Sequence, residues 1–121
     1  MGAGFTAYGE TEKEIIRRGL PAVEAVLLRG GREEKLRLLL ALDWFMDPYF
    51  RQDTAAMADG LCRLLQTAAV SSGDTEVSEA ALGLLTDYCW PPFPILEAGL
   101  ESVPAETRGE ALYAVRMDRE D

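Results

Sequence analysis

The sequence predicts an all-α protein, a short α-solenoid of about three helical hairpins followed by a closing C-terminal helix. The first observation is an internal repeat. Leu38–Tyr49 (LLLALDWFMDPY) aligns without gaps on Leu82–Phe93 (LGLLTDYCWPPF), so that Asp43 falls on Asp87, 44 residues later. An apolar helix followed by a proline-containing turn, repeated at this period, is typical of stacked helical hairpins. The second observation is that no segment shows the sustained alternation of a β-strand.

The first two helices are predicted to be short. Thr11 and Glu14 have the spacing of a capping box, so the first helix is expected to start at Glu12. Pro21, which is tolerated in the first turn of a helix, then opens a second helix. This helix is expected to end at about Arg29, because two glycines follow and glycine readily adopts the conformation that terminates a helix.

The third and fourth helices are longer. Arg32–Phe45 is apolar almost all the way round its centre, which predicts a helix buried by neighbours on several sides. A proline-containing turn at residues 46–48 ends it. Asp53 or Thr54 is expected to cap the fourth helix, whose apolar residues recur at helical spacing. The loop Ser71–Asp74 ends this helix.

The last three helices follow the same logic. Asp74 or Thr75 is expected to open the fifth helix as its N-cap. The turn at residues 90–94, which contains three prolines and two aromatic side chains, matches the proline turn one unit earlier. A sixth helix is expected to extend as far as Val103, and Pro104 is expected to begin the seventh.

Residues 32–103 resemble the HEAT and armadillo class of α-solenoid repeats. The resemblance rests on two-helix units of this period, with a proline at the hairpin turn and an aspartate shortly before it. It implies a stacked array that binds partners, usually proteins, on a ridge or concave face, and it supplies no catalytic residue. The whole chain, 1–121, is then one helical-repeat domain, and residues 1–10 and 117–121 are expected to be frayed.

The charge of the chain is concentrated in its C-terminal part. Residues 1–70 carry 10 acids and 9 bases, whereas residues 71–121 carry 11 acids and 3 bases, so nearly all of the net charge of −9 lies in the second segment. Such a field repels nucleic acid and anionic lipid, and it attracts cationic partners over a Debye length of about 8 Å. The predicted partner is therefore a basic protein, not a nucleic acid or a membrane.

The residues that most chemistry requires are missing. The chain has no histidine, which removes the commonest general base and metal ligand. Cys62 and Cys89 lack the spacing of a zinc site, and no glycine-rich phosphate loop is present. We therefore expect no enzyme activity, catalytic residue, metal or cofactor. The two cysteines are expected to be reduced thiols in a cytoplasmic protein, with a disulfide between them as the geometric alternative.

The leading functional hypothesis is a protein-binding module that masks a basic partner. In type, the chain resembles the small acidic immunity proteins that neutralise bacterial toxins. Two aromatic anchors at the proline-rich turn and five carboxylates are expected to contact the partner: Trp90, Phe93, Asp87, Glu97, Glu101, Glu106 and Glu110. The competing interpretation is structural, with the aromatic rings packing the hairpin turns and the aspartates accepting backbone hydrogen bonds there.

Two alternatives of other classes are kept. A small-molecule or peptide receptor would use a cleft between helices, lined by Trp44, Met46, Met57 and Cys62. A self-assembling scaffold subunit would stack through its last helix, which carries Leu112, Tyr113 and Val115. The sequence does not fix the oligomeric state.

Overall fold

The computed structural model describes residues 9–46, 57–90 and 92–116, and within these ranges the chain is helical with no strand. The predicted all-α class is confirmed. The α-helices are α1 (Glu10–Arg17), α2 (Leu20–Arg29), α3 (Arg32–Met46), α4 (Ala58–Ser71), α5 (Thr75–Tyr88), α6 (Pro94–Ala98) and α7 (Arg108–Arg116). Two 3₁₀ turns, η2 (Leu100–Ser102) and η3 (Ala105–Thr107), connect α6 to α7. None of the described helices is both long and apolar enough to cross a membrane.

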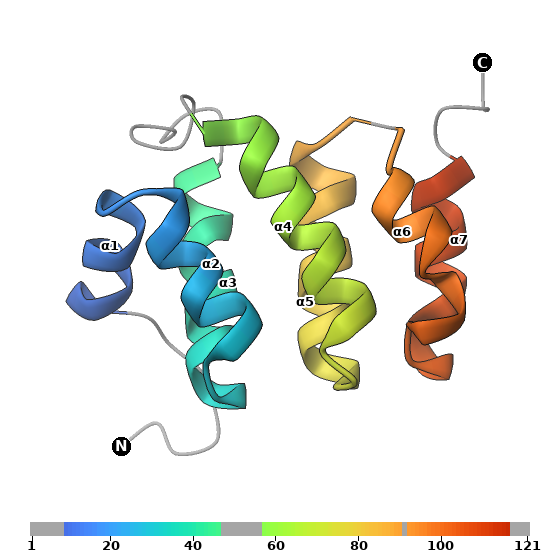
Figure 1. Cartoon of the computed structure of the whole chain (residues 1–121), viewed down its shortest axis with the longest axis horizontal. Helices are drawn as coiled ribbons and strands as arrows, with labels where there is room; N and C mark the ends of the chain where they lie inside the picture. The colour runs from blue at the N-terminus through green and yellow to red at the C-terminus, as the bar shows by residue number, and fades with distance from the viewer. Residues whose placement is uncertain (1–8, 47–56, 91, 117–121) are drawn as a thin grey trace.

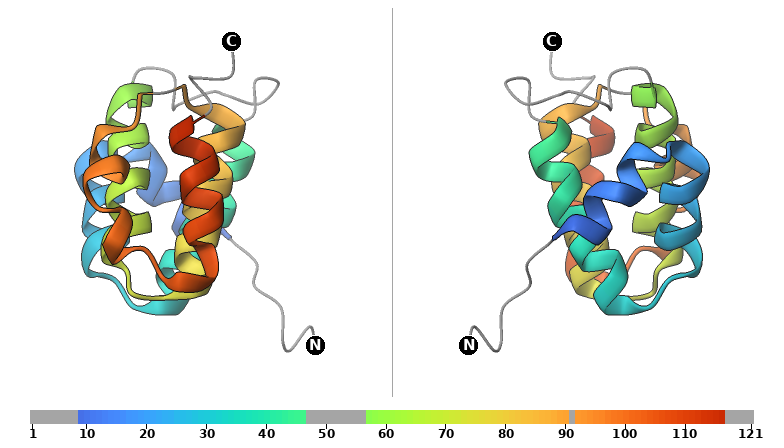
Figure 2. Two further views of the ribbon diagram at one scale, coloured as in Figure 1. Left: turned by 90° about the vertical axis from the view of Figure 1, so that its right-hand side faces the viewer. Right: turned by 90° about the vertical axis from the view of Figure 1, so that its left-hand side faces the viewer.

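The helices lie in two layers (Figures 1 and 2). One layer contains α2, α4 and α6 in that order, and the other contains α3, α5 and α7, because each helix contacts the next helix of its own layer. Consecutive helices pair across the layers, α2 with α3, α4 with α5 and α6 with α7. The arrangement leaves the outer sides of the two layers as the broad faces of the molecule.

The core lies between the layers and is almost entirely aliphatic. Leu38, Leu42, Leu61, Leu65 and Leu85 are completely buried. Burying one such side chain contributes about 1.5–3 kcal/mol of hydrophobic free energy. The almost uniformly apolar centre of α3 is explained by this position, because α3 contacts α1, α2 and α5.

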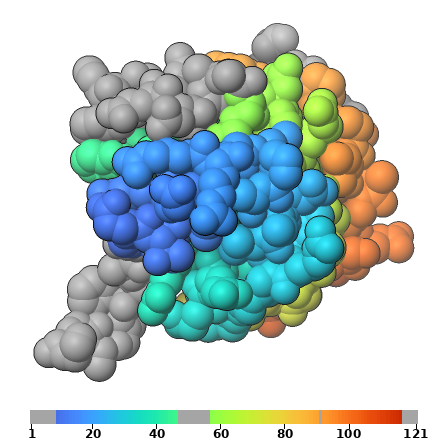
Figure 3. Space-filling view, turned by 60° about the vertical axis from the view of Figure 1, so that its left-hand side comes forward, coloured from blue at the N-terminus to red at the C-terminus, as the bar shows by residue number. Residues whose placement is uncertain are grey.

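Helix α1 covers the N-terminal end of the two layers (Figure 3). It contacts both α2 and α3, and it buries Ile16 against them. Its outward side is polar, with Thr11, Glu14, Arg17 and Arg18 exposed. A polar outer face of this kind protects the end of a helical stack from further association.

Helices α1 and α3 both begin after a glycine whose backbone N–H is accepted by a glutamate three residues later. For α1, this corrects the predicted start. The Glu12 carboxylate accepts the backbone N–H of Gly9 at 2.7 Å, so the helix begins two residues earlier than the Thr11 pattern predicted. Likewise, the Glu34 carboxylate accepts the backbone N–H of Gly31 at 2.7 Å at the start of α3. A glutamate three residues into the helix satisfies a backbone donor in both places.

The connection from α6 to α7 also differs from the prediction. Helix α6 ends at Ala98 and the chain continues through two 3₁₀ turns, so no single helix reaches Val103. Gly99 packs against the branched side chain of Val70, which brings this connection close to α4. Pro104 precedes the turn η3, and the α-helical part of the last segment begins at Arg108.

Cys62 and Cys89 form a disulfide, so the prediction of two reduced thiols is wrong. Their Cα atoms lie 6.1 Å apart, and the bond joins the first half of α4 to the residue that follows α5. Cys62 faces α5 because the two helices pair closely along their length. The alternative that the sequence left open, a pairing of the two cysteines, is the correct one.

Some predictions fall on residues that the structure does not describe. The cap proposed at Asp53 or Thr54 and the turn around Pro48 lie outside the described ranges. The expected frayed ends, 1–10 and 117–121, also lie outside them, apart from Gly9 and Glu10.

Candidate protein-binding groove

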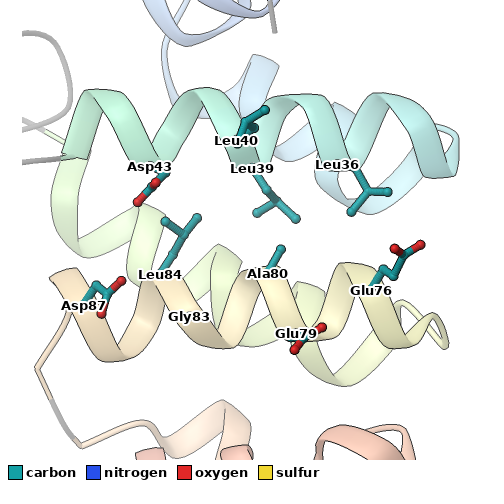
Figure 4. A pocket seen from close by; sticks show the side chains of 10 residues that line it. All are labelled: Leu36, Leu39, Leu40, Asp43, Glu76, Glu79, Ala80, Gly83, Leu84 and Asp87. Carbon is teal, nitrogen blue, oxygen red and sulfur yellow. The ribbon is translucent and has the colours of Figure 1, made fainter. Parts of the chain in front are cut away.

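An open groove of about 450 Å³ lies between α3 and α5, and Figure 4 shows the side chains that line it. Its floor is apolar, with Leu39 and Leu84 buried and Leu36 and Ala80 partly buried. Leu40 is 39% exposed beside them. We call this site the α3–α5 groove, which is lined by Leu36, Leu39, Leu40, Asp43, Glu76, Glu79, Ala80, Gly83, Leu84 and Asp87.

Carboxylates stand toward both ends of the α3–α5 groove. Asp43 and Asp87 lie on facing helices at one end, and Glu76 lies at the other (Figure 4). None of the described residues that line the groove is a lysine or an arginine. The combination of an apolar floor and a carboxylate pair at one end matches a ligand that is apolar in its middle and cationic at the end that meets Asp43 and Asp87.

At the end with Asp43 and Asp87, Tyr88 of α5 forms a hydrogen bond to Asp43 of α3. The Tyr88 hydroxyl lies 2.9 Å from Asp43 Oδ1 and 3.1 Å from the Asp43 carbonyl oxygen, and it donates to this pair of acceptors. Because the bond joins the C-terminal turns of α3 and α5, it fixes how the two helices end side by side. The negative ends of both helix dipoles therefore point toward the same place as the two aspartates, which favours a cation there.

The opposite end holds an ion-pair cluster. Arg32 Nε donates to Asp74 Oδ2 at 2.7 Å, and the Arg32 guanidinium also pairs with Glu76. Asp74, one of the two residues that the sequence offered, is the N-cap of α5 and accepts the backbone N–H of Val77 at 3.0 Å. The hydrogen bond from Val77, together with the neighbouring Arg32, holds the pKa of Asp74 below its ordinary value, although partial burial opposes this effect.

A second depression of about 420 Å³ continues the surface from α5 to α7. Glu79 and Gly83 line both depressions, so the two share a border on α5. On the α7 side, Glu110 and Tyr113 are exposed, with Tyr113 63% accessible. The layer formed by α3, α5 and α7 thus carries one connected acidic surface.

The structure separates the carboxylates that the sequence grouped together. Asp87 lines the α3–α5 groove and Glu110 lines the neighbouring depression. Glu106 lies on η3, where its carboxylate accepts the Thr75 hydroxyl at 3.3 Å. Glu97 and Glu101 are exposed on α6 and η2, in the other layer or at its edge. These five residues therefore do not form one surface.

The two predicted aromatic anchors have opposite environments. Phe93 is only 1% exposed and belongs to the core, so its predicted role as an exposed anchor is wrong and the structural interpretation is correct for this ring. Trp90 is 84% exposed. It follows the disulfide residue Cys89 and lines a depression of about 470 Å³ beside α4, which shares no lining residue with the α3–α5 groove.

The residues that sequence reasoning missed are Leu36, Leu40, Asp43, Glu76 and Glu79. The repeat contained a usable signal, because Asp43 aligns with Asp87 and Leu40 with Leu84. Two aligned helices of one layer place such residues side by side. The charge asymmetry pointed elsewhere, since it favoured the second half of the chain and Asp43 belongs to the first.

The residues proposed for a small-ligand cleft lie in different environments, and none of them lines the α3–α5 groove. Met46 is buried in the core, Cys62 is in the disulfide, and Trp44 is 47% exposed. Neither these three nor Met57 lines the α3–α5 groove.

Two findings, on metal-binding clusters and on related proteins, bear on this surface. In the described ranges, no three Cys, Asp or Glu side chains gather closely enough to hold a metal ion. No family model, no curated protein and no solved structure matches this chain.

Proposed function

We propose that this chain is a non-catalytic protein-binding module that masks a basic segment of a partner protein in the α3–α5 groove. The observation that carries the proposal is the composition of the groove: an apolar floor with carboxylates at both ends and no base among the described lining residues. An interface needs desolvated apolar contacts for affinity and complementary charge for orientation and rate. The groove supplies both.

The overall charge of the chain supports the same partner class. A net charge of −9 on 121 residues attracts a basic protein before contact and repels nucleic acid phosphate. Of the groove carboxylates, Glu76 is paired with Arg32 inside the molecule. Asp43 accepts the neutral Tyr88 hydroxyl, and this bond brings no positive charge to the carboxylate.

The architecture fits the α-solenoid interpretation. The hairpins α2–α3, α4–α5 and α6–α7 stack in order, and α1 covers the first of them, which is the arrangement expected of a short HEAT-like array. In such an array one layer offers a continuous binding face. The α3, α5 and α7 layer has that role here, and an immunity-like module would occlude a cationic face of its target with it.

The disulfide bears on where this masking takes place. Disulfides persist in oxidising compartments and are rare in reduced cytosol. The Cys62–Cys89 bond therefore counts against the cytoplasmic location that the sequence suggested.

A charge-reversal experiment with matched controls tests the proposal. Asp43→Lys with Asp87→Lys changes the net charge from −9 to −5 within the groove, and Glu97→Lys with Glu101→Lys makes the same change outside it. Each protein is used to capture partners from the lysate of the source cell, and the captured protein is then purified and its binding titrated by calorimetry. We expect a basic protein that binds with 1:1 stoichiometry. Its binding should weaken at high salt and should be lost only with the groove variant.

Other outcomes separate the competing surfaces. If only the Glu97 and Glu101 variant loses the partner, the binding face is the one that the sequence suggested. If both variants weaken binding equally, bulk charge alone acts and the groove has no special role. Either result overturns the proposal.

A small-molecule receptor is the second candidate, because a volume of about 450 Å³ lies in the range of ligand pockets. A thermal-shift screen with small cationic amphiphiles distinguishes it. Stabilisation that disappears with the groove variant would favour a receptor, since a ligand that binds only the folded state stabilises it more, the further its concentration exceeds its Kd.

A further inference from the structure

We infer that the segment held in the α3–α5 groove is an amphipathic helix, with an apolar stripe in its middle and basic residues toward both ends. This inference rests on the proposed function and specifies the form of the partner. Three features of the groove lead to it: its hydrogen-bonding groups, its length and an unexplained glycine.

The groove offers hydrogen-bond acceptors but hardly any donors. Its described lining consists of aliphatic side chains, one glycine and four carboxylates. A partner in extended conformation presents unpaired backbone carbonyls, and burying them without donors is unfavourable. A helix satisfies its own backbone groups and needs nothing from an apolar floor except shape. The donor-poor lining therefore selects a helix over an extended strand.

The separation of the acidic ends fits a short helix. Glu76 and Asp87 are 11 residues apart on α5, which corresponds to roughly 16 Å at 1.5 Å per residue. A partner helix of about three turns spans that distance. Its basic residues then stand opposite the two ends, with the stronger attraction at Asp43 and Asp87, because Glu76 is already paired with Arg32. Leucine-like residues at helical spacing meet Leu36, Leu40 and Leu84.

Leu40, at the floor of the α3–α5 groove, is left partly exposed by the rest of the chain. Its repeat equivalent Leu84 is only 4% exposed, whereas Leu40 is 39% exposed at the matching position of α3. An aliphatic side chain at a repeat position that is buried in the next unit is a natural contact for a bound helix.

Gly83 has no explanation inside the molecule. It lies in the middle of α5, and a Cβ added there would meet no atom within 4 Å. Its φ is not positive, so the backbone does not require glycine. A glycine inside a helix destabilises the helix relative to alanine. The missing side chain leaves room in the groove for another helix to approach the backbone of α5 closely.

Synthetic peptides test the inference directly. The first has about 18 residues, with leucines at helical spacing and lysines near both ends. The second has the same composition but alternates leucine and lysine as a strand would. The third is the helical peptide with glutamate in place of lysine. We expect the first to bind at least ten-fold more tightly than the second, and the third not to bind, when binding is measured by fluorescence anisotropy at low salt.

Gly83→Ala gives a readout in which stability and binding change in opposite directions. The variant should raise the Tm, since alanine is the better helix former and the site is open. It should also lower the affinity for the helical peptide at least five-fold. Gly109→Ala is the matched control, because this exposed helical glycine is equally open but lies in the depression next to α7. It should leave the affinity for the helical peptide unchanged.

The outcomes separate this inference from the proposed function. If the alternating peptide binds as tightly as the helical one, and both lose binding to the Asp43→Lys and Asp87→Lys variant, then the inference of a bound helix is wrong. The proposed masking function would still hold. Equal affinities for wild type and Gly83→Ala also overturn the close approach of a helix. If basic peptides bind unaffected by the groove reversal, both the inference and the proposed function fail.

Discussion

The Tyr88 hydroxyl donates to the Asp43 carboxylate and carbonyl, at 2.9 and 3.1 Å. The bond therefore joins the two segments that align in the sequence repeat, Leu38–Tyr49 and Leu82–Phe93. Tyr88 aligns with Trp44 in the repeat, and Asp43 aligns with Asp87. The aspartate of one unit therefore receives a hydrogen bond from the aromatic residue of the next. The sequence suggested that the aspartates accept backbone donors within their own turns. The turn that follows Asp43 lies outside the described residues, and the described bond of its carboxylate comes from the next unit.

Tyr88→Phe should reduce the free energy of unfolding by about 0.5–1 kcal/mol, since it removes one partly solvated hydrogen bond and leaves the ring in place. Urea denaturation measures the change. Tyr113→Phe removes the hydroxyl of an exposed tyrosine on α7 and should stay within about 0.5 kcal/mol of wild type. In a double-mutant cycle with Asp43→Ala, a coupling energy of zero would refute the bond between the side chains.

The positions of several helices follow from the sequence because their signals are local. The helix predicted over Arg32–Phe45 is observed over Arg32–Met46, and of the two predicted starts of α5, Asp74 or Thr75, Asp74 is the N-cap. Caps and apolar periodicity act over a few residues, so they can be read without knowing the tertiary structure. The start of α1 was misplaced by two residues because Gly9 and Thr11 both precede a glutamate at the capping-box spacing, and the glycine is used.

The groove could be predicted only in part, because it depends on which helices become neighbours. The repeat aligned Asp43 with Asp87, but the order of helices within a layer was needed to place them at one end of the same groove. Phe93 and Trp90 show the same limit. Both aromatic residues belong to one proline-rich turn, yet one is buried and the other is 84% exposed. Their spacing alone does not show which ring faces the core.

Gln66 is a cap that sequence patterns do not reveal, because it acts from another helix. Its side-chain oxygen accepts the backbone N–H groups of Ile95 and Leu96, at 2.9 and 3.1 Å, at the start of α6. Gln66→Leu should cost roughly 2–4 kcal/mol, since two buried donors lose their acceptor at about 1–3 kcal/mol each with partial relaxation. Thermal and urea unfolding measure the loss. Thr67→Val on the same helix is the control, and an equal effect there would contradict the capping role.

Loss of the disulfide should reduce stability without unfolding the protein. The bond closes a loop across 27 residues, for which the chain-entropy relation gives roughly 3–4 kcal/mol. We compare the oxidised protein with its reduced form and with the variant Cys62→Ala, Cys89→Ala by urea denaturation. The reduced form and the double variant should unfold at similar, lower urea concentrations. A midpoint unchanged by reduction would show that the bond does not constrain the unfolded chain as expected.

Asp74 predicts a specific dependence of stability on acid. The pKa of Asp74 is lowered in the folded protein, chiefly by the hydrogen bond from the Val77 backbone N–H, whereas an unfolded aspartate titrates near about 3.9. The charged form is thus favoured by folding, so its stabilising contribution is complete above pH 5 and disappears as the pH falls through the lowered folded pKa. Asp74→Asn can still cap α5 but cannot ionise, and Asp74→Ala should additionally lose about 1 kcal/mol of cap energy. The difference in unfolding free energy between wild type and Asp74→Asn should therefore shrink between pH 5 and pH 2, because the charge that distinguishes them is lost. A difference that stays constant over this range would mean that the charge on Asp74, and with it the pair to Arg32, contributes nothing to the junction of α3 and α5.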